Sequence, residues 1–319
     1  MALPRTKLLH GREVGTLAGL LALCAALWVA TPHFATVSNL VNVVEQSAII
    51  GIVAVGMTFV ILTGGIDLSV GSIVALSGVA LGTAHEAGLP IAAAAAVGLT
   101  VGLACGLGNG ALITLGRLPP FIATLGMMSV ARGIALMLSD GRPISSYPAS
   151  FRALATGHVL GIPFPVILML AIYAVAHFLL TRTLLGRYTY AIGGNEEASA
   201  LSGINVRAYK AAAYAIAGLL SAVTSMLLVA RLNSAQPIAG IMYELDAIAA
   251  VVIGGTSLLG GSGTVIGTLI GALIMGVLRN GLNLLGVSSY LQQVAIGSVI
   301  IVAVLVDMML RRRARRAAE

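Results

Sequence analysis

Two glycine-interrupted stretches place polar groups between long apolar blocks. The first is ILTGGIDLSVGS, residues 61–72, in which Gly64 and Gly65 precede Asp67 and Ser69. Paired glycines interrupt a helix, and Asp67 and Ser69 can cap the helix that restarts. A carboxylate near membrane depth is costly unless it is paired or hydrated. Asp67 therefore either caps the restarted helix at the interface or belongs to a polar path or its gate.

A second break, VVIGGTSLLGGSG at residues 251–263, loosely echoes the first. Gly254 and Gly255 interrupt an apolar block whose start carries Glu244 and Asp246. Broken helices of this kind form the binding sites of many membrane transporters. The residues that we predict to line or gate a translocation pathway are Gly64, Gly65, Asp67, Ser69, Arg132, Gly254 and Gly255.

Arg132 is included because it is a charge inside the apolar stretch MMSVARGIALM. A guanidinium in that position has to pair with a carboxylate, face water or extend to the interface. Asp67 and Glu45 are possible partners, and the spacing does not choose between them.

The polar segment GRYTYAIGGNEEASALSGINV, residues 186–206, predicts a short capped helix after a glycine turn. Asn195 can cap this helix, and two glutamates in its first turn suit the helix dipole. Gly203 ends it. Such a helix is a suitable docking element for another protein, although an ordinary connecting loop has the same pattern. The residues of the turn and the helix start are Gly193, Gly194, Asn195, Glu196, Glu197 and Ala198.

The composition shows what kind of scaffold must position these groups. Of 319 residues, 58% are hydrophobic and only 9% are charged, whereas an ordinary soluble domain carries about 25% charged residues. The apolar residues form long blocks with the charges mostly between them, which is typical of a polytopic membrane protein. The net charge of +7 does not indicate a nucleic-acid partner, because the basic residues gather at the two ends and in short loops.

The apolar blocks predict an all-α transmembrane bundle of about ten spans. A bilayer core of about 30 Å needs roughly 20 helical residues, and the third and eighth predicted spans are short by this measure. The predicted spans are 14–31, 47–63, 70–86, 89–115, 118–139, 161–181, 211–231, 246–260, 263–282 and 290–309.

Lysine and arginine predict which side of the membrane each loop faces. They gather in the tail 1–13, in the loop 182–210 and in the basic tail 311–319. An even number of spans places all three segments, and so both termini, in the cytoplasm. Residues 140–160 and 232–245 then form outward loops, and residues 1–319 form one transmembrane domain.

Several enzyme signatures are absent from the sequence. Neither lysine follows a glycine, which excludes a G-x-x-x-x-G-K-[ST] phosphate loop. The five histidines are scattered and form no metal-binding pattern with the two cysteines, and there is no G-x-S-x-G nucleophile motif. We therefore predict no catalytic residue, no metal, no cofactor and no intrinsic enzymatic activity.

Long strings of the chain resemble the permease subunits of bacterial ABC sugar importers. They are most similar to the ribose-type branch of the family shared with branched-chain amino-acid permeases, and the resemblance runs from about residue 30 to residue 310. The strings are AVGMTFVILTGGIDLSVGSIVALSG, LGRYTYAIGGNEEASALSGINV, ARLNSAQPIAGIMYELDAIAAVVIGGTSLLGGSGTVIGTLIGALIMGVLRNGLNLLGVSSY and AVLVD.

The resemblance implies a type II-like importer permease in the bacterial inner membrane. It would act as a homodimer with two copies of a separate cytoplasmic ATPase, and a periplasmic sugar-binding protein would deliver the substrate. The family's coupling loop would fall on Gly193 to Gly203, where Ser199 replaces the second alanine of the usual E-A-A pattern. Ribose is the first expectation for the substrate, and another pentose, a hexose or inositol is the alternative.

Two other classes fit the same residues. An ion-coupled secondary transporter could use Asp67 beside its glycine pair as a cation or proton site, and it would transport without an ATPase. A membrane scaffold without a pathway would tolerate bulky replacements at Gly64, Gly65 and Asp67.

Overall fold

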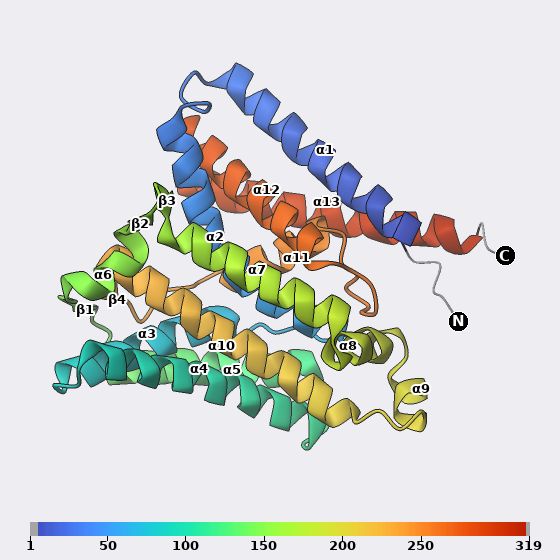
Figure 1. Cartoon of the computed structure of the whole chain (residues 1–319), viewed down its shortest axis with the longest axis horizontal. Helices are drawn as coiled ribbons and strands as arrows, with labels where there is room; N and C mark the ends of the chain where they lie inside the picture. The colour runs from blue at the N-terminus through green and yellow to red at the C-terminus, as the bar shows by residue number, and fades with distance from the viewer. Residues whose placement is uncertain (1–5, 317–319) are drawn as a thin grey trace.

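The structure, a computed structural model, describes residues 6–316, with the side chains of 6–12, 303, 306, 307 and 310–316 outside that description. It is helical apart from four two-residue strands (Figure 1). The predicted basic tails, 1–13 and 311–319, fall almost wholly on residues whose side chains are not described. The elements are α1 (Thr6–Ala30), α2 (Val37–Leu62), α3 (Val70–Glu86), α4 (Ile91–Thr114), α5 (Pro120–Leu138), β1 (Ile144–Ser145), α6 (Ala149–Thr156), β2 (His158–Val159), β3 (Ile162–Pro163), α7 (Phe164–Arg182), α8 (Leu184–Gly194), α9 (Glu196–Leu201), α10 (Val206–Leu232), β4 (Ser234–Ala235), α11 (Tyr243–Ile253), α12 (Val265–Leu284) and α13 (Ser289–Arg316).

Seven helices of the described chain are long and apolar enough to cross a membrane. They are α1, α2, α4, α5, α7, α10 and α12. The other three predicted spans correspond to α3 with 17 residues, α11 with 11 residues, and α13, whose described apolar part is Ser289–Val302. An 11-residue helix is about 16 Å long, roughly half of a bilayer core. The polytopic helical class is therefore confirmed, and the count of ten spans is not.

The second predicted span starts too late in the sequence. α2 begins at Val37 rather than at residue 47, and the hydroxyl of Thr36 caps it by accepting from the amide of Asn39. Asn39 and Asn280 of α12 exchange two side-chain hydrogen bonds of 3.0 and 2.8 Å. These partners let the polar residues of this segment continue the apolar helix.

The centre of the bundle is formed by α2 and α10, the most deeply buried of the long helices. α10 packs on α2, α3 and α4, and α12 packs on α1, α2 and α11. Four glycines of α4 at four-residue spacing, Gly98, Gly102, Gly106 and Gly110, are buried. A Cβ at the last three would meet α10, so these glycines allow two helix backbones to approach closely.

One end of the molecule carries the strands. Residues of β1 and β4 pair antiparallel, with Ile144 opposite Ala235, and the amide of Tyr147 donates to Asn233 Oδ1 at 3.0 Å. The loops 140–160 and 232–245, predicted to share one side, thus meet at one end. α9 lies at the other end, because α10 starts directly after it and runs for 27 residues, about 40 Å, before β4.

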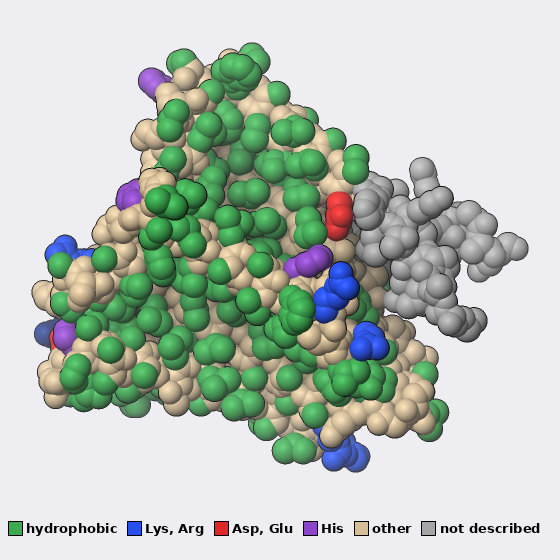
Figure 2. All heavy atoms as spheres, viewed as in Figure 1, with side chains coloured by type: hydrophobic (Ala, Val, Ile, Leu, Met, Phe, Trp, Pro, Cys, Tyr) green, Lys and Arg blue, Asp and Glu red, His purple; other side chains and the backbone are tan. Residues whose placement is uncertain are grey.

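The surface is suited to lipid. In the view of Figure 2, hydrophobic side chains are spread over the whole face, and the Lys and Arg side chains gather toward the left edge and the lower right. The lower right is the end at which Figure 1 places α8 and α9. Large apolar side chains such as Trp28 and Val29 of α1 are mostly exposed, as expected for helices that a bilayer surrounds.

Candidate functional site

The loop after α2 holds Asp67 in a fully buried position. Asp67 Oδ1 accepts from the amide of Ser69 at 2.8 Å and from the Ser69 hydroxyl at 2.6 Å. Asn109 of α4 in turn donates to Ser69 Oγ at 2.8 Å. Asp67 Oδ2 has no hydrogen-bond partner among the described residues. The carboxylate thus stabilises the turn before α3, whose N-cap residue is Ser69, without capping the first helical turn directly.

Arg132 lies elsewhere. Its guanidinium donates to the carbonyl oxygens of Pro237 at 2.7 Å and Ala239 at 2.8 Å. In the described part of the chain it forms no ion pair with Asp67 or Glu45. Arg132 therefore satisfies the carbonyls of an irregular segment between β4 and α11, and the two predicted pathway charges do not meet.

The two helix breaks and the end of α8 meet backbone to backbone. The amide of Gly261 donates to the Leu62 carbonyl at 3.0 Å. A Cβ on Gly193 would overlap both Leu62 O and Gly261 N, and a Cβ on Gly260 would overlap Gly64 N. We call the segments 62–65, 193–194 and 260–261 the glycine junction. Glycine is needed at positions 193, 260 and 261 because the three backbones approach there more closely than a side chain allows.

Gly254 and Gly255 do not belong to this junction. A Cβ on Gly254 would meet the backbone of Gly267, so Gly254 serves the packing of α11 on α12. Gly255 has a positive φ of 89° in the turn that ends α11. The glycines that reach the other break are Gly260 and Gly261, which lie in the same motif but were not singled out.

The predicted capped helix is α9, Glu196–Leu201, beside the glycine junction in sequence. Asn195 Oδ1 accepts from the amide of Ala198 at 2.9 Å, as the motif predicts. Gly203 follows the helix with a φ of +82°. Glu196 binds Lys210 of α10 at 2.6 Å, and Leu201 is 87% exposed. A groove of about 560 Å³ lies between the end of α4 and the segments α9 and α10.

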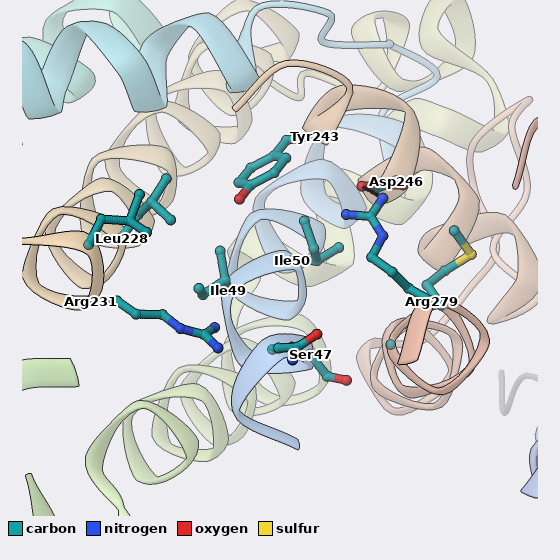
Figure 3. A pocket seen from close by; sticks show the side chains of 12 residues that line it. Ser47, Ile49, Ile50, Leu228, Arg231, Tyr243, Asp246 and Arg279 are labelled. Atoms are coloured by element: carbon teal, nitrogen blue, oxygen red, sulfur yellow. Dashed lines mark hydrogen bonds and ion pairs between the residues drawn. The ribbon is translucent and has the colours of Figure 1, made fainter. Parts of the chain in front are cut away.

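A pocket of about 340 Å³ opens at the other end of the bundle, between α2, α10, α11 and α12. Arg279 Nη2 and Asp246 Oδ2 form an ion pair there at 2.7 Å. Figure 3 shows Arg279, Arg231 and Tyr243 extending from three different helices toward the same space. The other lining residues are Gln46, Ser47, Ile49, Ile50, Leu228, Leu232, Met275 and Gly276.

Neither Arg279 nor Arg231 was predicted from the sequence as a site residue, although a signal for Arg279 was present. Arg279 lies inside the predicted span 263–282, and a charge within a span is by default a functional candidate. Asp246 was noted only as the start of a span. Asn109 was missed as well, although it is a polar residue within a glycine-rich apolar span. Among the described residues, no group of three or more His, Cys, Asp or Glu could hold a metal ion.

Long apolar helices, two broken segments and a charged pocket within the bundle define a polytopic helical membrane protein. The chain matches the family described as "Branched-chain amino acid transport system / permease component" over residues 39–305. The chain belongs to this family.

Its relatives include sugar permeases. The chain is 50% identical to the ribose import permease protein RbsC of Haemophilus influenzae, over 90% of this chain and 90% of the relative. It is also 50% identical to RbsC of Bacillus subtilis, over 93% of this chain and 92% of the relative. The D-allose transport system permease protein AlsC of Escherichia coli is 39% identical, over 92% and 91%. No solved structure shows a significant match to the chain.

Proposed function

We propose that this chain is the membrane-spanning permease subunit of an ABC importer that carries ribose into the bacterial cytoplasm. The observation that carries the proposal is the 50% identity to two ribose import permeases over at least 90% of each chain. ATP is hydrolysed by a separate cytoplasmic ATPase, and a periplasmic binding protein delivers the sugar. The permease acts as a homodimer, with the termini and α9 in the cytoplasm and with α3, α11 and α13 completing ten membrane segments.

Reconstitution tests this function. The permease, its ATPase and its binding protein are placed in proteoliposomes, and uptake of labelled ribose is followed with and without ATP. We expect uptake only with all three proteins and ATP. Uptake by the permease alone, driven by an ion gradient, would instead identify a secondary transporter. A preference for allose over ribose in competition would identify the other sugar that the relatives' names suggest.

The orientation has its own test. Single cysteines at Ser202 and Ala317 should react only with reagents on the cytoplasmic side, and a cysteine at Ser146 only with reagents outside. The Lys and Arg distribution supports this assignment. Labelling of Ala317→Cys from outside would contradict the even number of spans.

The coupling role of α9 rests on its exposed surface. Leu201 is an apolar side chain without cover on a short, capped helix, and the groove beside it is wide enough to receive part of another protein. A docked ATPase would bury that side chain. The segment that it pushes, Gly193–Gly194, touches both helix breaks, so movement of α9 reaches Leu62 and Gly261 directly.

Replacing Glu197 with Arg and Gly203 with Trp tests the coupling role. Gly203 has a positive φ and nothing within 4 Å of an added Cβ, so the cost of its replacement is confined to the end of α9. We expect the protein to assemble in the membrane while ribose-stimulated ATP hydrolysis is lost. Wild-type stimulation in this double variant would remove α9 from the proposed coupling path.

A further inference from the structure

We propose that the pocket between α2, α10, α11 and α12 is the place where the permease itself holds a neutral, hydroxyl-rich monosaccharide during transit. This inference rests on the proposed import function and adds to it a substrate-contacting site. None of the glycine-break residues lines this pocket. Its volume of about 340 Å³ lies within the range of small-molecule sites.

The position of the pocket suits the arrival of a substrate. It is lined by the first half of α2 and the last turn of α10, at residues 46–50 and 228–232. Residues 228–232 are at the opposite end of α10 from α9, and residues 46–50 lie in the middle of α2, at least 12 residues or about 18 Å from Leu62 in the glycine junction. In the proposed orientation this is the outer end, where a binding protein releases its sugar, and the glycine junction closes the inner end.

The side chains of the pocket can contact both the hydroxyl groups and the ring carbons of a sugar. A guanidinium donates, a carboxylate accepts, and an amide or phenol hydroxyl can do both, so Arg279, Asp246, Gln46 and Tyr243 together can bind hydroxyl groups that are donor and acceptor at once. The remaining walls are largely apolar and can contact the ring carbons. A ligand site in a protein typically combines a mostly apolar lining with a few convergent polar groups.

The ion pair between Asp246 and Arg279 leaves part of the guanidinium free to bind a ligand. Asp246 is 4% exposed while Arg279 is 38% exposed. The buried carboxylate therefore holds one side of the guanidinium and leaves other N–H groups facing the pocket. A fork of fixed donors is pre-organised for recognition, which lowers the entropy lost on binding.

The charge balance of the region favours a neutral ligand. Arg231, Arg279 and Asp246 line the pocket, and their formal charges sum to +1. Glu45, which lines a small adjoining cavity together with Arg231, offsets this charge. A cation would find no excess of negative charge in the pocket, whereas a polyol can use its donors and acceptors.

Cysteine protection tests the site directly. Gln46→Cys is made in a background with Cys24→Ala and Cys105→Ala, and its alkylation rate is measured in the reconstituted complex with and without ribose. We expect ribose to slow alkylation of Gln46→Cys, and to leave unchanged the rate for Ser146→Cys, which lies at the same end outside the pocket. Leu232→Cys is a second reporter from the pocket wall should Gln46→Cys fail to assemble.

Transport gives a second readout. Tyr243→Phe removes one hydroxyl and keeps the ring, so we expect the ribose concentration that gives half-maximal import to rise about tenfold, the effect on affinity of losing one ligand hydrogen bond. Absence of ribose import by the wild-type complex would overturn the proposed function. Wild-type import with equal alkylation in the presence and absence of ribose, or protection by sulfate but not by ribose, would overturn this site while leaving the import function standing.

Discussion

The glycine junction is formed by backbone contacts, whereas the pocket between α2, α10, α11 and α12 is formed by side chains. The glycine junction joins three chain segments through backbone atoms, with Gly193 pressed against Leu62 O and Gly261 N. The opposite pocket is built from long side chains on four helices, with a cavity of about 340 Å³ between them. A backbone junction has almost no freedom to rearrange, whereas side chains around a cavity can change rotamer.

This difference indicates a division of labour in the proposed transport cycle. A tightly packed junction has few arrangements and passes a displacement from one segment to the next, as a gate linked to α9 requires. An open polar pocket exchanges partners, as a site that takes up and releases a ligand requires. Variants in the two regions should therefore differ, above all in how much each one lowers the free energy of unfolding.

The largest effect is expected at the junction. Gly193→Val places a side chain where the Leu62 carbonyl and the Gly261 amide already lie, and backbone atoms of three segments cannot all yield. We expect a loss of at least about 3 kcal/mol, the upper range for overpacking, and no transport. The measurements are thermal unfolding of the protein in detergent and ribose uptake.

Gly194→Ala is the matched control, because an added Cβ there has nothing within 4 Å. It should unfold at the wild-type temperature and transport normally. Equal behaviour of the two variants would mean that the junction is less tightly packed than the structure indicates.

The second effect is expected in the pocket. Asp246→Ala leaves Arg279 without its partner inside the bundle. Breaking a fully buried pair costs about 3–5 kcal/mol, and the loss here should be smaller because Arg279 is partly exposed. Thermal unfolding should show Asp246→Asn combined with Arg279→Gln to be more stable than Asp246→Ala. Asp140→Asn neutralises an exposed pair of 3.9 Å and keeps a side chain that tolerates the positive φ of 50° at this position, so it should leave the unfolding temperature unchanged.

A smaller effect is expected at Asp67, next to the junction. Asn retains the acceptor that binds the amide and hydroxyl of Ser69, so Asp67→Asn should cost about 1 kcal/mol or less. Asp67→Leu removes that acceptor and should cost about 1–3 kcal/mol. Because Arg132 binds the carbonyls of Pro237 and Ala239, Arg132→Gln should not rescue any Asp67 variant. Rescue in a transport assay would contradict the separation of these two charges.

The smallest effect is expected at the ion pair of α9. Glu196→Gln breaks the pair with Lys210, in which the Glu196 side chain is 55% exposed and that of Lys210 is 12% exposed. Solvent at the glutamate keeps the loss near the value of about 1 kcal/mol or less that surface pairs contribute. The unfolding temperature should therefore change little. ATPase binding in a pull-down is the sensitive measurement, with Leu201→Ala as the comparison that removes an exposed apolar contact. A large drop in stability for Glu196→Gln would show that α9 is part of the packed core.

Much of this architecture was predictable because helices that cross a membrane need long, continuous apolar segments, which are easily recognised in a sequence. Apolar blocks of about 20 residues predicted the seven long helices. Asn195 at the start of α9 and Gly203 after it were predicted from capping chemistry, which depends only on neighbouring residues. Local rules worked because each of these features is decided within one or two helical turns.

Contacts between distant segments were decided only by the tertiary structure. Arg132 donates to the carbonyl of Pro237, and Asn109 donates to the hydroxyl of Ser69. Asp246 forms an ion pair with Arg279. The role of Gly260 and Gly261 in the junction, rather than Gly254 and Gly255, also depends on where α8 returns to the bundle. The type of a residue predicts that a buried charge needs a partner, or that a glycine permits a close approach of two backbones. Which partner and which approach follow from the packing of helices, and that packing is a property of the whole chain.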